Sequence, residues 1–89
     1  MPKALVCINT DFFAAEEVLA ELEKFAEIEE AFLVHGVYDV IAKIRAESTE
    51  GLLDIVTRKI KRIQSVQTVH TMLIVESGEA RREEQVLTA

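Results

Sequence analysis

The chain has 89 residues, of which 49% are hydrophobic, with one proline and three glycines. This length allows one domain with a modest core, and the composition is too apolar for a disordered chain. A formal net charge of −6 disfavours unaided nucleic-acid binding, and no apolar stretch approaches the roughly 18 residues of a membrane span. With no basic segment leading into an apolar one at the start, we expect a cytoplasmic protein that binds neither nucleic acid directly nor membranes.

The first part of the chain predicts a strand followed by an amphipathic helix. Residues 3–9 form an apolar run too short for a helix, and Cys7 inside it is expected to be a small buried hydrophobe. Residues 13–27 carry apolar side chains at helical spacing, with glutamates filling the other side. Asp11 is the expected N-cap of this helix.

A hairpin and a second helix are predicted next. Residues 30–35 and 39–45 are extended apolar runs divided by the short loop 36–38, where a glycine supplies turn freedom. Ser48 or Thr49 can cap the helix that follows. Its apolar stripe recurs at spacings of four, four and three residues: Leu52, Val56, Ile60 and Ile63.

Residues 66–75 alternate in the manner of a final strand, and the charged residues 79–89 have too few apolar side chains for a core. We therefore divide the chain into a domain, residues 1–78, and a C-terminal tail, residues 79–89.

The order strand, helix, strand, strand, helix, strand predicts an α+β, ferredoxin-like βαββαβ fold. Right-handed crossovers give it a four-stranded antiparallel sheet with two helices on one face. Both alternating sets of side chains in the last two strands are largely apolar, apart from Lys43 and Arg45. Since the helices cover only one face, we expect the other face to bind a second subunit and the chain to dimerise through the sheet.

A search for catalytic and metal-binding patterns finds little. His35 and His70 belong to strands expected at opposite edges of the sheet, too far apart for one metal site within a subunit. The serines lie at element boundaries, where capping and turn formation explain them, and no glycine-rich phosphate loop is present. We expect no enzyme activity, no catalytic residue, no metal and no cofactor.

The loop between the second and third strands is the most distinctive segment. Gly36, Tyr38 and Asp39 bring backbone donors, an aromatic ring and a carboxylate to one place, which could hold an ammonium group. The same residues also make an ordinary hairpin, in which the carboxylate binds loop amides, and the residues alone favour that second interpretation.

At this loop, His35-Gly36-Val37-Tyr38-Asp39-Val40-Ile41 resembles the G-x-[YF]-D hairpin of the effector-binding RAM domain of Lrp/AsnC transcriptional regulators. The resemblance continues into the last strand, where Thr68 and Thr71 reproduce the Thr-x-x-Thr spacing, and covers about residues 3–77. It implies a domain that dimerises through its sheet, assembles into rings of dimers, and holds a small effector such as an amino acid between dimers.

By this resemblance the effector site maps to Gly36, Tyr38, Asp39, Thr68, His70 and Thr71. Because the chain starts directly at the first strand, it is similar to a stand-alone RAM protein without the family's helix-turn-helix. The resemblance then implies a ligand-sensing and oligomerisation module, with full-length Lrp/AsnC regulators as further partners.

Two alternatives stay open at this point. The same element order occurs in dimeric α+β barrel monooxygenases, whose cavities lie between sheet and helices, but His70 is the only clear acid–base candidate here. The chain could also be a pure assembly partner of full-length regulators that binds no effector. An RNA-recognition module is rejected, since the fold would need exposed aromatics and basic charge on its sheet.

Overall fold

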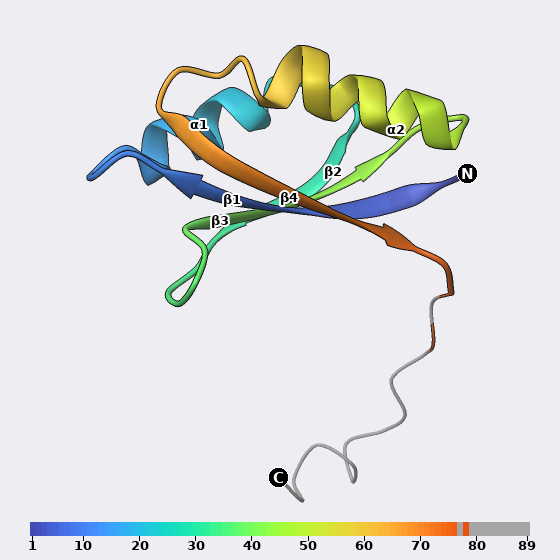
Figure 1. Cartoon of the computed structure of the whole chain (residues 1–89), viewed down its shortest axis with the longest axis horizontal. Helices are drawn as coiled ribbons and strands as arrows, with labels where there is room; N and C mark the ends of the chain where they lie inside the picture. The colour runs from blue at the N-terminus through green and yellow to red at the C-terminus, as the bar shows by residue number, and fades with distance from the viewer. Residues whose placement is uncertain (77, 79–89) are drawn as a thin grey trace, which may run out of the picture.

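The computed structural model describes residues 1–76 and 78, and over them strands and helices follow one another in the expected order (Figure 1). The predicted tail, residues 79–89, lies outside the described residues. The elements are, in chain order, β1 (Lys3–Thr10), α1 (Ala15–Leu22), β2 (Ile28–Leu33), β3 (Val40–Arg45), α2 (Thr49–Ile55), the π-helical segment η1 (Val56–Ile60) and β4 (Val66–Ile74).

The four strands form one antiparallel sheet in the order β2-β3-β1-β4, and both helices cover the same face of it (Figure 1). The predicted ferredoxin-like fold is confirmed. Among the described residues, no helix has the length and apolar character needed to cross a membrane. We call the sheet face away from the helices the open face. No helix or strand of the described residues covers it.

The core lies between the sheet and the helices. Alternate residues of β1, namely Ala4, Val6 and Ile8, are fully buried there, together with their counterparts on β3. Since successive side chains of a strand point to opposite faces, the residues between them belong to the open face. Cys7 is one of these, yet it is buried, and burial raises the pKa of its thiol.

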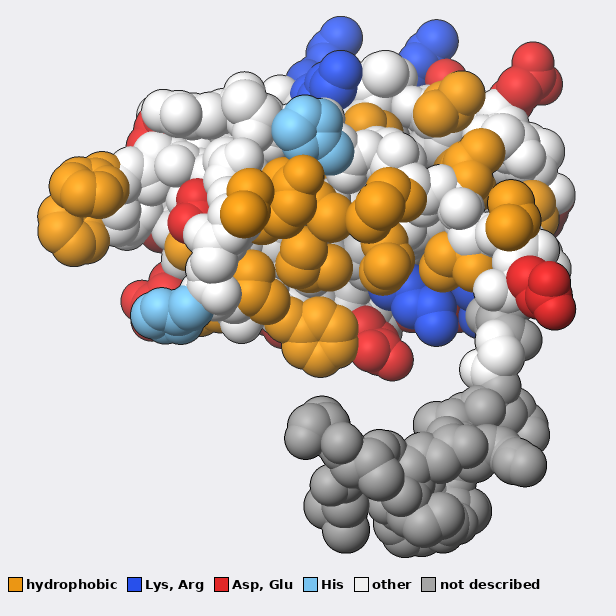
Figure 2. Space-filling view, turned by 60° about the horizontal axis from the view of Figure 1, so that its bottom comes forward, with side chains coloured by type: hydrophobic (Ala, Val, Ile, Leu, Met, Phe, Trp, Pro, Cys, Tyr) orange, Lys and Arg blue, Asp and Glu red, His pale blue; other side chains and the backbone are white. Residues whose placement is uncertain are grey.

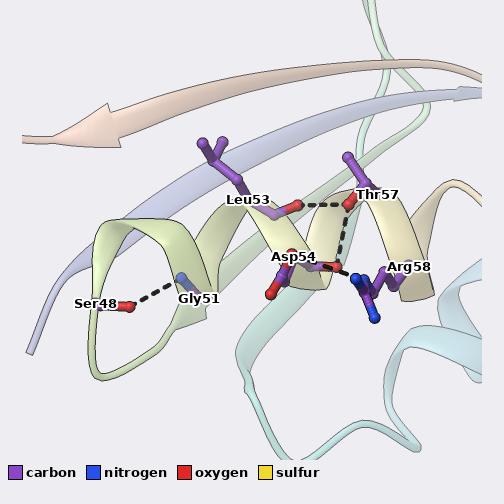
Figure 3. A network of polar contacts seen from close by, with 6 residues as sticks. All are labelled: Ser48, Gly51, Leu53, Asp54, Thr57 and Arg58. Atoms are coloured by element: carbon purple, nitrogen blue, oxygen red, sulfur yellow. Dashed lines mark hydrogen bonds and ion pairs between the residues drawn. The ribbon is translucent and has the colours of Figure 1, made fainter.

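The second helix begins as expected at a serine cap. The Ser48 hydroxyl accepts a hydrogen bond from the backbone N–H of Gly51 at 3.0 Å (Figure 3). The predicted stripe faces the core, with Leu52, Val56 and Ile60 buried. Residues spaced by four drift about 40° per step around an α-helix. The wider η1 turn, in which Lys61 N–H donates to the Val56 carbonyl at 2.8 Å, reduces this drift and keeps Ile60 over the core.

The first helix is shorter than predicted, and the expected cap at Asp11 is wrong. Phe13 has a φ of 63°, a left-handed conformation that an α-helix cannot include, so α1 begins only after Ala14. The Asp11 carboxylate accepts a hydrogen bond from the Gln67 side chain at 2.7 Å instead. At the other end, the N–H of Phe25 donates to the Leu22 carbonyl, a tighter turn that ends the helix.

The hairpin loop is longer than predicted. Strand β2 ends at Leu33 and β3 begins at Val40. The Val34 N–H donates a hydrogen bond to the Asp39 carbonyl at 3.0 Å and so joins the two ends of the loop. His35 therefore lies in the loop and not in the strand, while His70 lies in β4.

Candidate functional site

The hairpin loop reaches across the end of β1 to the edge strand β4. The Tyr38 hydroxyl and Nδ1 of His70 are hydrogen bonded at 3.0 Å, although 32 residues separate them in the sequence. Their rings meet edge to face with centroids 5.7 Å apart. This contact joins the loop to β4, and no described residue hydrogen bonds to His70 Nε2. In the tautomer whose Nδ1 accepts from the tyrosine, Nε2 would carry the proton and could donate.

Asp39 holds the end of β1 in place. Its Oδ2 atom accepts a hydrogen bond from the Thr10 backbone N–H at 2.9 Å, and the Thr10 hydroxyl lies 3.5 Å from the same oxygen. The Asp39 N–H donates to the Ile8 carbonyl at 2.9 Å. Within the described residues, Oδ1 of Asp39 accepts no hydrogen bond, so one oxygen of this half-buried carboxylate is available to a ligand.

A second set of polar contacts ties the same three segments together. The Thr68 hydroxyl on β4 donates to Asn9 Oδ1 on β1 at 2.7 Å. The Asn9 amide nitrogen donates in turn to the Val37 carbonyl in the loop at 2.8 Å. Asn9 and Thr10 were not predicted as site residues. Antiparallel pairing of the first strand with residues 39–45 was the signal that could have placed them beside Asp39.

The structure distributes the six predicted site residues over two faces. Tyr38, Thr68 and His70 lie together at one end of the open face, beside Asp39. Gly36 lies in the exposed loop with a φ of 152°, where an added Cβ would meet no atom within 4 Å. Thr71 pairs with Val6, which is buried under the helices, so its side chain points to the opposite face of β4 from that of His70.

Next to these polar residues the open face is apolar, as the hydrophobic side chains gathered in Figure 2 show. Side chains of paired residues lie in rows across the four strands. The row nearest the loop is Phe32, Ile41, Cys7 and His70. The next row is mixed, with the apolar Leu5 and Met72 beside the charged Glu30 and Lys43. Phe32 is 49% and Met72 51% exposed, so apolar area remains uncovered in this chain.

The far end of the open face is charged. The Glu29 carboxylate lies 3.3 Å from Lys3, 3.5 Å from Arg45 and 4.0 Å from Lys43. Partial desolvation of this carboxylate is outweighed by the hydrogen bond from Lys3 and the three positive charges, which lower the pKa of Glu29. The apolar side chains of the open face, among them Phe32, Leu5 and Met72, thus lie between an ionic cluster at one end and the hairpin residues at the other.

No group of three or more histidine, cysteine, aspartate or glutamate side chains suited to a metal occurs in residues 1–76 and 78. The sheet order also places β2 and β4 at opposite edges, as predicted. The hairpin groups supply hydrogen bonds and charge, which is the chemistry by which proteins hold small polar molecules directly.

The family model of the Lrp/AsnC ligand binding domain matches residues 3–83. The chain belongs to this family. Among curated relatives of this Lrp/AsnC domain, the regulatory protein AsnC of Escherichia coli K12 is 29% identical over 59 residues, which are 66% of this chain and 39% of that protein. The chain thus spans well under half the length of that regulator. The family is one of transcription regulators.

Solved structures carry the same Lrp/AsnC fold. TTHA0845 from Thermus thermophilus is 25% identical with a TM-score of 0.83, over 90% of this chain and 100% of that one. The feast or famine regulatory protein Rv3291c of M. tuberculosis was solved complexed with L-methionine. It is 23% identical with a TM-score of 0.76, over 93% of this chain and 56% of that one.

Proposed function

We propose that this chain works in the cytoplasm as a stand-alone ligand-sensing and oligomerisation module of the Lrp/AsnC type. It binds a small effector such as an amino acid between subunits and binds no nucleic acid directly. The observation that carries the proposal is the meeting of Tyr38 and Asp39 with Thr68 and His70 at one end of the open face. The stand-alone form is supported by the Thermus structure, because the match covers 100% of that solved chain.

The chemistry of the site suits an amino acid. Asp39 Oδ1 can accept a charge-assisted hydrogen bond from an ammonium group, and His70 Nε2 can donate to a carboxylate. The apolar row beginning at Phe32 adjoins these groups and can receive an apolar side chain. Gly36 can offer the backbone of the loop tip, whereas the Thr71 side chain points to the other face of β4, away from such a ligand. The L-methionine complex of the M. tuberculosis relative supports this ligand class.

The open face supplies the subunit contact. Its apolar side chains would be covered by the same side chains of a second copy, since a two-fold axis brings identical patches together. The hairpin site lies at the margin of this face, where a neighbouring subunit can close it. The same surface would let the chain assemble with full-length Lrp/AsnC regulators, and dimers could join further into rings.

The proposal is tested by a thermal-shift screen of the purified chain against the proteinogenic amino acids, beginning with L-methionine. A ligand at about 100 times its dissociation constant adds roughly 2.7 kcal/mol to the free energy of unfolding. In a domain of this size that raises the melting temperature by about 10 °C or more. If no amino acid moves the melting temperature, the sensing function is wrong.

One observation favours a second function, that of a pure assembly partner of full-length regulators. Asp39 Oδ2 is already bound to the Thr10 N–H, as a carboxylate with a purely structural role would be. In that case the screen would show no ligand, while the chain would still bind a regulator that carries the same domain.

A further inference from the structure

The tip of the hairpin loop, residues 35–38, is attached to the rest of the molecule through few contacts. Within the described residues, two hydrogen bonds join it to other elements. One is donated by the Asn9 side-chain amide to the Val37 carbonyl at 2.8 Å. The other joins the Tyr38 hydroxyl to His70 at 3.0 Å. Because both are exposed and the tip contains a glycine, the position of the tip depends on the two contacts together.

The Asn9 amide has one orientation that fits its neighbours. The Val37 carbonyl can only accept a hydrogen bond, so the amide nitrogen of Asn9 faces it. The amide oxygen then faces Thr68, whose hydroxyl donates to it at 2.7 Å. Reversing the amide would place two acceptor oxygens against each other at the loop. The side chains of Thr68 and Asn9 thus form a chain of hydrogen bonds that runs from β4 through β1 to the loop.

Asn9 lies where the pairing of β1 with β4 becomes irregular. It is opposite Thr68, whereas the next residue, Thr10, is opposite Val66, so the register shifts between Asn9 and Thr10. Irregularities of this kind redirect side chains and are frequent beside functional sites. Directly after Asn9, the Thr10 N–H donates to Asp39 Oδ2. Two neighbouring residues of β1 therefore hold two parts of the hairpin, Asn9 the loop tip and Thr10 the carboxylate of Asp39.

We propose that Asn9 is a positioning residue for the hairpin site. It holds the loop tip where the Tyr38 hydroxyl meets His70, which we call the closed loop, and it does not bind the effector itself. The inference rests on the proposed function for its effect on affinity. Each exposed hydrogen bond favours the closed loop only a few-fold, so the loss of one opens the loop in part. A ligand that needs the closed loop then binds more weakly, in proportion to the fraction of chains still closed.

The sequence supplies a reporter of the loop position. Tyr38 is the only tyrosine of the chain, which has no tryptophan, so tyrosine fluorescence comes from this loop alone. A phenol that is hydrogen bonded to a base such as imidazole fluoresces weakly, because the hydrogen bond quenches the excited ring. The wild type should therefore be dim, and His70→Ala, which removes the acceptor, should be bright. Emission between these two levels measures the fraction of chains in which the loop is open.

The test measures tyrosine emission and ligand affinity in the same proteins. The probe is L-methionine, or the proteinogenic amino acid that the thermal screen identifies in its place. Asn9→Ala removes both hydrogen bonds of the amide, and Asn9→Asp keeps the acceptor for Thr68 but sets a carboxylate oxygen against the Val37 carbonyl. Both variants should be brighter than the wild type without ligand and bind the probe about three- to tenfold more weakly. Saturating probe should return their emission toward the wild-type level.

Gln67→Ala is the matched control. It removes a comparable exposed hydrogen bond, which joins β4 to Asp11 and does not reach the hairpin. Its emission and its affinity for the probe should equal those of the wild type.

The two readouts separate positioning from the other roles open to Asn9. If Asn9 only supports the pairing of β1 with β4, its variants melt at a lower temperature but keep the wild-type emission, and the inference is overturned. If Asn9 binds the effector itself, affinity falls while the emission without ligand stays unchanged, which also overturns it. Brighter variants with wild-type affinity, or a wild type as bright as His70→Ala, have the same consequence. A wild type that binds no amino acid contradicts the proposed function instead, and the emission without ligand then still decides whether Asn9 holds the loop.

Discussion

The two oxygens of Asp39 have different surroundings, and this difference separates a binding role from a structural one. Asp39→Asn keeps an acceptor for the Thr10 N–H and removes the charge, whereas Asp39→Ala removes both. We expect Asp39→Asn to melt near the wild-type temperature and to bind an amino-acid effector about ten- to a hundredfold more weakly. Asp39→Ala should show the same loss and also be less stable by about 1 kcal/mol. Calorimetric titration and melting of both variants measure this; an asparagine variant with normal affinity would leave Asp39 only its structural role.

At the scale of residues, the sequence identified side chains that could bind a ligand, but not which of them lie next to one another in the fold. Tyr38 and His70 were chosen for separate reasons, and only the folded chain brings their hydroxyl and imidazole to 3.0 Å. Thr71 was included through a motif spacing, although strand alternation turns its side chain away from that of His70. Asn9 was overlooked because its role depends on contacts with β4 and with the loop, which follow from pairing and not from local pattern.

At the scale of elements, the start of β2 is tied to η1 by one ion pair. The Lys59 ammonium group donates to Glu27 at 2.8 Å, and this hydrogen bond holds the pKa of Glu27 below its usual value. A carboxyl group with a lowered pKa in the folded state stabilises the fold above its unfolded pKa and loses that effect as pH falls through the folded value. Glu27→Gln should therefore cost about 0.5 kcal/mol at pH 7, given the partial exposure of the pair, and less at about pH 3, because protonation of the carboxyl group removes part of this effect.

Urea unfolding at both pH values and one protein concentration measures this difference. Glu23→Gln, an exposed carboxylate outside the ion pairs of the described residues, is the control. An equal cost for Glu27→Gln at both pH values would show that Glu27 acts by packing and not by charge.

The elements themselves were largely predictable where periodicity and cap chemistry agree. Ser48 begins α2, and the apolar stripe after it faces the core, as expected. The first helix was predicted too long because its spacing alone reveals neither the left-handed Phe13 before it nor the tight turn at Phe25 that ends it. The loop that contains Phe13 is held by contacts of Asp11 with Ser65 and Gln67. Those partners are more than fifty residues away in the sequence.

At the scale of the whole molecule, the uncovered apolar side chains of the open face, such as Phe32 and Met72, predict a subunit contact. Met72→Glu should convert the dimer to a monomer, because an unpaired charge buried at an interface costs several kcal/mol. Leu53→Glu, on the helix side with similar exposure, should leave the dimer intact. Light scattering during size-exclusion chromatography distinguishes the two variants. A Met72→Glu protein that elutes as a dimer would show that the open face is not the contact.

The central claim is that an amino-acid effector binds between subunits, and linkage gives the most direct test of it. A ligand that binds only where subunits meet must strengthen their association by the same free energy with which assembly strengthens binding. The measurement is equilibrium sedimentation of the wild-type chain at increasing concentrations of the amino acid that the thermal screen identifies. We predict that the dissociation constant between subunits falls steadily as the amino acid is added, and that Asp39→Asn weakens this response. A dissociation constant that stays unchanged at saturating amino acid would contradict the claim.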